Sequence, residues 1–314
     1  MTTINIEGEV YELRKLDESN IHDLCAAFNS IRKKDQSLTF FKKKYDSSWI
    51  GQKKYLGYLI YHNKKVVGFC GSTIYKLIDY QGKIYILGQF GDLFIDSDLR
   101  GKGIPQKGLR QFELLTTEQE IDGVFTFPSR MAQSLFEKAQ WNNIGNFVTY
   151  QFNIRTYPLL KILNKFSIQR YFFRFAKLFG STEFPKANHA KITDNKLKVI
   201  HDEQFFKYKK YDRYLFHQHN DYEFLWSLSD GILINSIDIA TEEELEKKIK
   251  YLKRFCFLRG IHTFSIICHD KSRLNKLLSE QYKGNISLPI FIKSFNPAID
   301  IDAIEFEGID RNAF

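Results

Sequence analysis

The sequence predicts an α/β protein with two lobes. Its 314 residues exceed the roughly 100–200 residues of one typical domain. In the first half, strand-like and helix-like segments follow the order β-α-α-β-β-β-α-β-α-β, which is typical of an α/β domain of about 150 residues. The second half repeats a mixed pattern of strands and helices after a basic, aromatic-rich stretch.

The elements of the first half follow from hydrophobic periodicity and from cap residues. Residues 9–16 alternate between apolar and polar side chains, which predicts a strand. The acidic and hydroxyl residues at 17–19 are typical of a cap, and they predict a helix that ends near Arg32. The same patterns predict further helices at 36–45, 105–120 and 129–139, and further strands at 55–62, 65–77, 84–96, 123–127 and 144–154.

The second half begins with the stretch at 157–179, which we interpret as one helix that ends at Gly180. Strands are expected at 231–239 and 263–268, with a charged helix at 241–255 between them. The residues after these are expected to form short strands and turns. The expected division of the chain is a first domain at 1–155, an interlobe helix and linker at 156–190, and a second lobe at 191–314.

The composition excludes several classes of protein. With 43% hydrophobic and 26% charged residues, the chain is neither disordered nor fibrous. No apolar run approaches the roughly 20 residues of a membrane span, and the sequence MTTINIEGEVYEL does not resemble a signal peptide. We therefore expect a cytoplasmic, reduced protein. No CxxC pair indicates a zinc site or a disulfide framework, and four scattered cysteines are expected to be packing residues: Cys25, Cys70, Cys256 and Cys268.

The charge balance is basic. The chain has 46 Lys and Arg against 37 Asp and Glu, which gives a net charge of +9. Six of the positive residues lie in one acid-free stretch between Arg155 and Lys177. Such a stretch suits nucleic acid, an anionic membrane or a phosphorylated small ligand, and composition alone does not choose among them.

The sharpest motif is the loop DLRGKGIP at residues 98–105, between an expected strand and an expected helix. Gly101 and Gly103 allow the backbone to turn its N–H groups toward an anion, because no Cβ obstructs the approach. The following helix adds the partial positive charge of its N-terminus, where Pro105 suits the first position. The loop is neither a Walker motif nor a Rossmann GxGxxG. We therefore expect a pyrophosphate-binding loop formed by Arg100, Gly101, Lys102, Gly103 and Ile104.

This loop resembles the motif Arg/Gln-x-x-Gly-x-Gly/Ala of the acetyl-CoA-dependent N-acyltransferases of the GNAT superfamily. Asp98 stands where the family has Arg or Gln. Residues 127–141 resemble a second family segment, FPN…A…Y-E-K-x-G-W/F, which separates two strands so that the acyl-pantetheine arm threads between them. Ser129 replaces the family's Asn, and Phe136 replaces a Tyr that often protonates the departing thiolate. The resemblance implies that both contact the cofactor, and helix packing is the alternative for Phe136.

Acyl transfer to an amine requires a neutral amine, and a nearby carboxylate promotes this as a general base. In the superfamily this base commonly comes from the fourth strand, which here offers Asp92, Asp96 and the neutral Gln89. Asp96 adjoins the loop and is expected to be structural. Asp92 lies in the apolar stretch FGDLF, where an unpaired carboxylate is costly. We predict that Asp92 is the catalytic base; the alternative is a carboxylate paired with the backbone or a nearby Lys. The resemblance also implies that backbone N–H groups around Phe94 and Ile95 polarise the thioester carbonyl.

Residues 91–96, the FP segment and Trp226 together resemble a subgroup of long, two-lobed GNAT proteins of polysaccharide and amino-sugar pathways. The second lobe resembles a degenerate GNAT repeat. Its phosphate loop is replaced by TEEELEKK at 241–248, whose acids repel a pyrophosphate. We expect this lobe to close the acceptor site and not to bind CoA. The fold expected is therefore a GNAT fold in the first lobe with a degenerate GNAT-like second lobe.

The sequence thus predicts an enzyme that transfers an acetyl or other short acyl group from acyl-CoA to the amino group of a sugar, with a nucleotide-linked amino sugar favoured. The alternatives are a CoA-dependent transferase for another small amine, an aminoacyl-type tandem transferase, and a non-catalytic membrane- or partner-binding protein that acts through residues 157–179. A small-molecule partner is expected, without nucleic acid or a stable membrane anchor. The oligomeric state stays open.

A metal is not expected. His217 and His219 share a strand face and Asp221 is close in sequence, but no third ligand and no zinc signature accompany them. We expect these histidines to contact the acceptor or to form a polar surface. Three aromatic residues of the same region stack on the acceptor or pack in the core: Tyr211, Tyr214 and Trp226.

Overall fold

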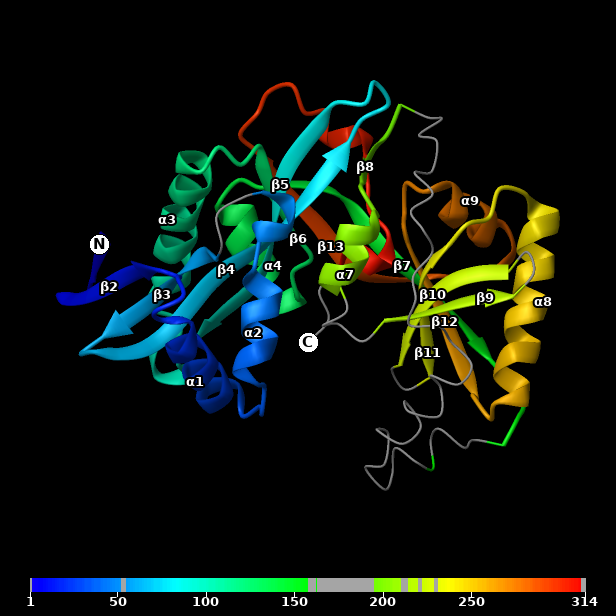
Figure 1. Ribbon diagram of the computed structural model, residues 1–314, viewed down its shortest axis with the longest axis horizontal. Coiled ribbons are helices and arrows are strands. Elements are labelled where there is room, and N and C mark those ends of the chain that lie inside the picture. The colour runs from blue at the N-terminus through cyan, green and yellow to red at the C-terminus, as the bar shows by residue number, and fades with distance from the viewer. Residues whose placement is uncertain are drawn as a thin grey trace. The chain divides into compact units, whose positions relative to one another are not determined.

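The computed structural model describes residues 2–51, 55–157, 162, 195–209, 214–219, 222–228 and 231–311 (Figure 1). The strands are β1 (Thr2–Ile6), β2 (Glu9–Lys15), β3 (Leu56–His62), β4 (Lys65–Ile78), β5 (Ile84–Ile95), β6 (Gly123–Thr126), β7 (Asn142–Asn153), β8 (Leu197–Val199), β9 (Leu215–His219), β10 (Tyr222–Leu228), β11 (Ile232–Ile237), β12 (Thr263–His269), β13 (Asn285–Ser294) and β14 (Ile304–Glu305). The helices are α1 (Ile21–Arg32), α2 (Leu38–Tyr45), α3 (Ile104–Glu118), α4 (Arg130–Lys138), α7 (Glu203–Lys209), α8 (Glu242–Leu258) and α9 (Arg273–Gln281). Short 3₁₀ turns include η2 (Ser97–Leu99) and η5 (Gly308–Asp310).

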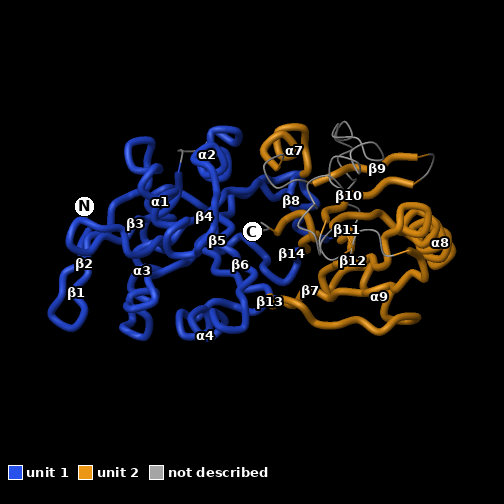
Figure 2. The backbone as a smooth tube through the Cα atoms, turned by 90° about the horizontal axis from the view of Figure 1, so that it is seen from below, with its two compact units in different colours: residues 1–144, 191–200, 290–304 blue, residues 145–190, 201–289, 305–314 orange. Residues whose placement is uncertain are grey.

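The chain forms two compact units (Figure 2). Unit 1 comprises residues 1–144, 191–200 and 290–304, and unit 2 comprises residues 145–190, 201–289 and 305–314. These units do not follow the expected division at 155 and 190. Most of β7 belongs to unit 2, and much of β13 belongs to unit 1. The expected α/β class is confirmed in both.

The sheet of unit 1 has the order β1-β2-β3-β4-β5-β6-β13. Its neighbours are antiparallel except for β5 and β6, which are parallel because α3 connects them as a crossover. Figure 2 shows α1 and α2 on one face of this sheet and α3 and α4 on the other. Each face therefore has a separate apolar core, one including Phe41 and Phe69 and the other including Phe90 and Phe112.

Unit 2 repeats this layout. Strands β9, β10 and β11 form an antiparallel meander, and α8 then connects β11 to the parallel strand β12, as α3 connects β5 to β6. The last strands of the two repeats are exchanged. β7 ends the first repeat but pairs with β12 in unit 2, whereas β13 ends the second repeat but pairs with β6 in unit 1. The mixed pattern expected to repeat in the second half is therefore present as a repeated layout, and the degenerate character of this lobe stays a prediction.

Most expected elements of the first half are present with boundaries shifted by a few residues. The expectation of only short strands and turns at the C-terminal end was wrong. Ser272 caps α9 by accepting a hydrogen bond from the Asn275 N–H at 3.1 Å. Pro289 interrupts the apolar pattern of β13, and the pairing with β6 begins only at Phe291. The helix expected at 157–179 lies outside the described residues, except for residues 157 and 162.

Candidate functional site

The expected phosphate loop follows directly on β5. The turn η2 begins after Asp96, whose carboxylate accepts a hydrogen bond from the Asp98 N–H at 3.5 Å, which agrees with a structural role. Gly101 and Gly103 have φ angles of +81° and +75°. These left-handed conformations are strained for residues with a Cβ, so the loop requires glycine at both positions. Gly103 is the N-cap of α3, and Pro105 lies in its first turn.

The loop and the start of α3 are open to an anion. Apart from the adjacent residues in the chain, no described atom lies within 4 Å of the position that a Cβ would take on Gly101 or Gly103. The N-cap residue Gly103 has no side chain to cap α3, which suits a helix start that presents its first-turn N–H groups and its partial positive charge to a ligand. Arg100 is exposed and Lys102 is half-buried. The residues present therefore fit the pyrophosphate of coenzyme A.

Strands β5 and β6 separate beside this loop. Their parallel pairing covers only three positions and ends at the pair Gln89–Phe125. β5 continues to Ile95, paired on its other side with β4. At the separation, Gly91 is an extra residue in the register with β4, because Gly71 faces Asp92 while Ser72 faces Phe90. Such a bulge bends the strand and redirects the side chains that follow. The edge of β5 that includes Phe94 and Ile95 lies beyond the last β6 pair, and their expected backbone role stays a prediction.

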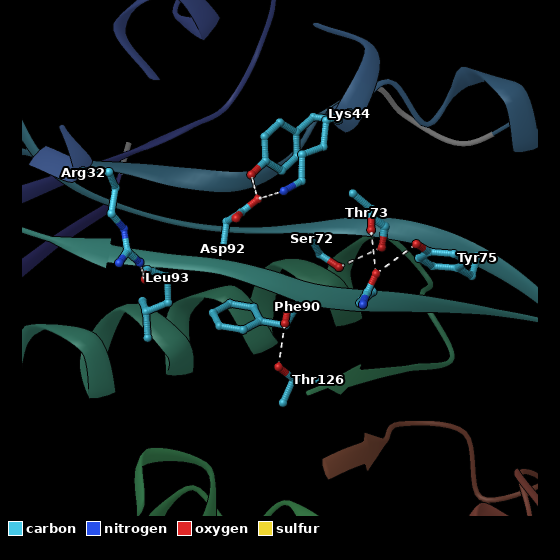
Figure 3. A network of polar contacts seen from close by, with 11 residues as sticks. Arg32, Lys44, Ser72, Thr73, Tyr75, Phe90, Asp92, Leu93 and Thr126 are labelled. Carbon is cyan, nitrogen blue, oxygen red and sulfur yellow. Dashed lines mark hydrogen bonds and ion pairs between the residues drawn. The ribbon is translucent and has the colours of Figure 1, made fainter. Parts of the chain in front are cut away.

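Asp92 is the carboxylate next to the bulge, and its side chain meets α2 (Figure 3). It is 6% exposed and forms an ion pair with Lys44, which is fully buried, with 2.8 Å between Nζ and Oδ2. The Tyr45 hydroxyl donates a hydrogen bond to the same carboxylate oxygen. Burial raises the pKa of Asp92 above its ordinary value, and the positive charges of Lys44 and Arg32 oppose this shift. Asp92 thus has the lysine partner that the structural alternative anticipated, and its catalytic role stays a prediction.

Helix α2 positions these partners. Ser37 caps it, since its hydroxyl accepts a hydrogen bond from the Phe40 N–H at 3.2 Å. Phe41, Lys44 and Tyr45 then follow at helical spacing on the buried face. Sequence reasoning missed Lys44 and Tyr45, because they lie in a short lysine-rich helix that resembles a solvated surface.

A row of buried polar groups continues along β4 and β5 from Asp92. Gln89 accepts hydrogen bonds from the Tyr75 hydroxyl at 2.9 Å and the Thr73 hydroxyl at 3.5 Å. Thr126 donates to the Phe90 carbonyl at 2.7 Å, across the point where β5 and β6 separate (Figure 3). Outside this buried row, the exposed Arg32 of α1 donates to the Leu93 carbonyl of β5 at 3.1 Å. Polar residues in the otherwise apolar β4 were the available sequence signal for this row.

The FP segment leads into α4. Ser129 is the N-cap of α4 but forms no capping hydrogen bond through its side chain. Phe136 is 2% exposed, and its ring centroid lies 5.8 Å from that of Phe90 and 4.9 Å from that of Trp141. The structure therefore accounts for Phe136 as a core residue, in line with the packing alternative. A cofactor contact of Ser129 or Phe136 stays a prediction.

Unit 2 has an equivalent separation of strands, but a chain segment fills it. The parallel pairing of β11 with β12 ends at Ile234, and Asn235 is the extra residue in the register of β11 with β10. Gly308 of η5 packs there: a Cβ on it would lie 2.5 Å from Ile267 Cγ2 and 2.8 Å from the Asn235 carbonyl oxygen. Glu307 forms a β-bridge with Cys268 of β12.

The start of α8 also differs from that of α3. The Thr241 hydroxyl accepts a hydrogen bond from the Glu244 N–H at 3.2 Å, and the Glu244 carboxylate accepts one from the Ala240 N–H at 2.6 Å. Glu242 and Glu243 add two more acids to the first turn. Side chains at the start of α8 thus accept hydrogen bonds from two of its backbone N–H groups, and the acids of its first turn repel an anion.

Most of the remaining described candidates are buried, whereas His219 is exposed with its ring stacked on Tyr251. His217 is buried, with 2.7 Å between its Nε2 and the Tyr251 hydroxyl, and Trp226 is buried in the core of unit 2. Tyr214 is buried as well, whereas Tyr211 and Asp221 lie outside the described residues. Within the described part of the chain, no group of three or more His, Cys, Asp or Glu side chains is arranged to hold a metal ion. Burial raises the thiol pKa to about 12 in three cysteines, which fits packing roles: Cys70, Cys256 and Cys268.

No described helix is long and apolar enough to cross a membrane. No family model matches the sequence, and no curated protein matches it. Similarity to solved structures is extensive, however. A GCN5-related N-acetyltransferase from Kribbella flavida is 9% identical, with 91% of this chain and 71% of that chain covered and a TM-score of 0.58. A probable N-acyltransferase from Enterococcus faecalis is 8% identical, with 91% and 73% covered and a TM-score of 0.60.

A third similar structure is the N-myristoyltransferase of Saccharomyces cerevisiae with bound myristoyl-CoA. It is 11% identical, with 93% of this chain and 84% of that chain covered and a TM-score of 0.54. At such identities the likeness concerns the fold. The resemblance drawn from the two motifs is confirmed at this level: the chain has the two-lobed fold of GCN5-related N-acetyltransferases.

Proposed function

We propose that the protein is an acyl-CoA-dependent N-acyltransferase. The observation that carries this proposal is the open glycine loop at the start of α3, whose N-cap is Gly103, next to the edge of β5 that lies beyond its last pair with β6. The loop offers backbone N–H groups and helix charge to a pyrophosphate. The edge of β5 offers backbone groups to the amides of a pantetheine arm. Acyl-CoA carries both chemical groups in one molecule.

In this proposal Asp92 is the general base. An aliphatic amine is mostly protonated near neutral pH, and Asp92 removes that proton directly or through a water molecule. The amine nitrogen then forms a bond to the thioester carbonyl carbon, and the carbon–sulfur bond breaks. As the carbon–sulfur bond breaks, the nitrogen loses its second proton to water, and water returns a proton to the leaving thiolate, since the Phe136 side chain offers none. Asp92 then releases its own proton to solvent. Lys44 and Tyr45 hold the carboxylate in place.

The proposed acceptor is the amino group of a small sugar, with a nucleotide-linked sugar favoured because the chain has a net charge of +9. The proposed setting is the cytoplasm, without nucleic acid and without a stable membrane anchor. The donor is acetyl-CoA or another short acyl-CoA, and no metal takes part in the steps described.

The direct test is a thiol-release assay that combines acyl-CoAs of increasing chain length with a panel of amines. The panel holds nucleotide-linked amino sugars, free amino sugars, polyamines and amino acids. Release with a nucleotide-linked amino sugar, absent in the Gly103→Val variant, supports the proposal. Release only with another amine class overturns the acceptor, and binding of no acyl-CoA by calorimetry overturns the function.

A further inference from the structure

The last two turns of α8 in unit 2 present an unusual solvent face. Five residues at positions i, i+3, i+4, i+7 and i+8 share one side of the helix, and all are exposed: Lys250, Lys253, Arg254, Phe257 and Leu258. The side chains of Phe257 and Leu258 are 55% and 66% exposed. An amphipathic helix ordinarily places such residues on its buried face. Here Leu252 and Phe255 already fill that buried face.

The chain that follows β7 extends this apolar face. The Thr156 hydroxyl donates a hydrogen bond to the Phe257 carbonyl at 3.0 Å, which holds the two segments together. Figure 1 shows this green segment beside the C-terminal end of α8. Tyr157 is 84% exposed. Together with Arg155 and Phe257 it lines an open hollow of about 650 Å³. The large apolar side chains of Tyr157, Phe257 and Leu258 are therefore exposed to solvent on the same part of the surface.

The two chain segments that supply these side chains carry charge of one sign after Glu246. No Asp or Glu occurs between residues 247 and 269 or between residues 146 and 182. Within the described part of the chain, no carboxylate forms an ion pair with Arg155, Lys250, Lys253 or Arg254. Cations around exposed aromatic and leucine side chains match the interface of an anionic bilayer, where apolar tips enter the headgroup region and cations face the lipid phosphates and carboxylates.

We propose that this surface, formed by Arg155, Tyr157, Lys250, Lys253, Arg254, Phe257 and Leu258, binds anionic membranes reversibly. A nucleic acid would use the cations and the aromatic rings but would gain little from Leu258. A bilayer uses all three kinds of side chain. Such binding is peripheral, since no described helix is able to span a membrane. The inference concerns unit 2 and is independent of the proposed acyl transfer.

The test is sedimentation of the full chain with vesicles of phosphatidylcholine alone or with about one-third phosphatidylserine, at ~0.1 M salt and at ~0.5 M salt. The intact protein is expected to sediment with the phosphatidylserine vesicles at low salt only. Lys253→Glu with Arg254→Glu, and separately Phe257→Ser with Leu258→Ser, are each expected to weaken binding at least about tenfold. Circular dichroism and thermal unfolding confirm that each variant is folded.

Matched controls alter the same chemistry elsewhere. Arg273→Glu with Lys276→Glu reverses two exposed charges on α9, and Met131→Ser with Ile286→Ser removes two exposed apolar side chains. Both controls are expected to bind as the intact protein does. The proposal is overturned if the intact protein does not sediment, if it sediments equally with both vesicles, or if the α8 variants bind as well as the controls. In the last case another segment makes the contact.

Discussion

The two units differ at the place where their parallel strands separate. In unit 1, the separation of β5 and β6 lies beside a glycine loop and the start of α3, whose N-cap is Gly103. In unit 2, Gly308 occupies the equivalent separation of β11 and β12, and Thr241 and Glu244 cap the start of α8. Both units have the meander, the bulge and the crossover helix. Under the proposed function, the difference teaches that the fold alone does not make a CoA site, because the site also needs an available strand edge and helix N–H groups that face the ligand. In unit 2, Gly308 occupies the strand separation, and side chains accept hydrogen bonds from two N–H groups at the start of α8.

The largest expected effect follows from the exchanged strands. A fragment of residues 1–155 lacks β13, so β6 loses its antiparallel partner and the core of unit 1 loses Phe291. We expect this fragment to fail to fold cooperatively, because an unpaired strand and a cavity of phenylalanine size are both costly. Urea denaturation followed by circular dichroism checks this. A fragment with a sharp transition like that of the full chain would contradict the exchange.

A second effect concerns Asp92. Asp92→Asn keeps the shape of the side chain but removes the base, and kcat is expected to fall about 10²–10⁴-fold with little change in CoA affinity. Activity should recover as the pH approaches the pKa of the acceptor amine, because free amine then forms without a base. Asp96→Asn, at the end of the same strand, is the matched control and should retain most of kcat. Full activity of Asp92→Asn near neutral pH would assign Asp92 a structural role.

The third effect tests the filled separation in unit 2. Gly308→Val places a side chain against Ile267 and the Asn235 carbonyl, and overpacking of this kind costs about 1–3 kcal/mol of the free energy of unfolding. CoA binding should stay unchanged. Unchanged stability of the Gly308→Val protein relative to the intact protein would place the segment outside the separation.

The smallest effect is a shift in pH dependence. Lys44 lowers the pKa of Asp92 against the effect of burial, so Lys44→Met should raise that pKa further. A general base acts when deprotonated, and the acid limb of the kcat profile should therefore move to higher pH. Lys43→Met, which removes an exposed lysine of the same helix, should leave the limb in place. An unshifted acid limb in a folded Lys44→Met protein would show that the ionisation of Asp92 does not control kcat.

Periodicity and cap residues predicted the first lobe well, from β2 to β7, because these signals are local. The exchange of β7 and β13 was not predictable, since the partner of a strand edge lies far away in the sequence and either strand satisfies the same pattern. The partners of Asp92 were missed for the same reason: Lys44 and Tyr45 lie more than forty residues away in the chain. By contrast, the glycine-rich loop motif is local in sequence, and it correctly singled out Gly101 and Gly103 as turn residues, since both adopt a positive φ.

Calorimetric titration of acetyl-CoA into the full chain tests most directly whether unit 1 alone carries the CoA site. One site per chain is expected. Gly103→Val should weaken it at least about tenfold, because a side chain would occupy the space open to the phosphates. Gly82→Val is the matched control, since Gly82 also has a positive φ, of +85°, in open space, and it should bind normally. Two sites per chain, or an unchanged dissociation constant in folded Gly103→Val, would contradict the account.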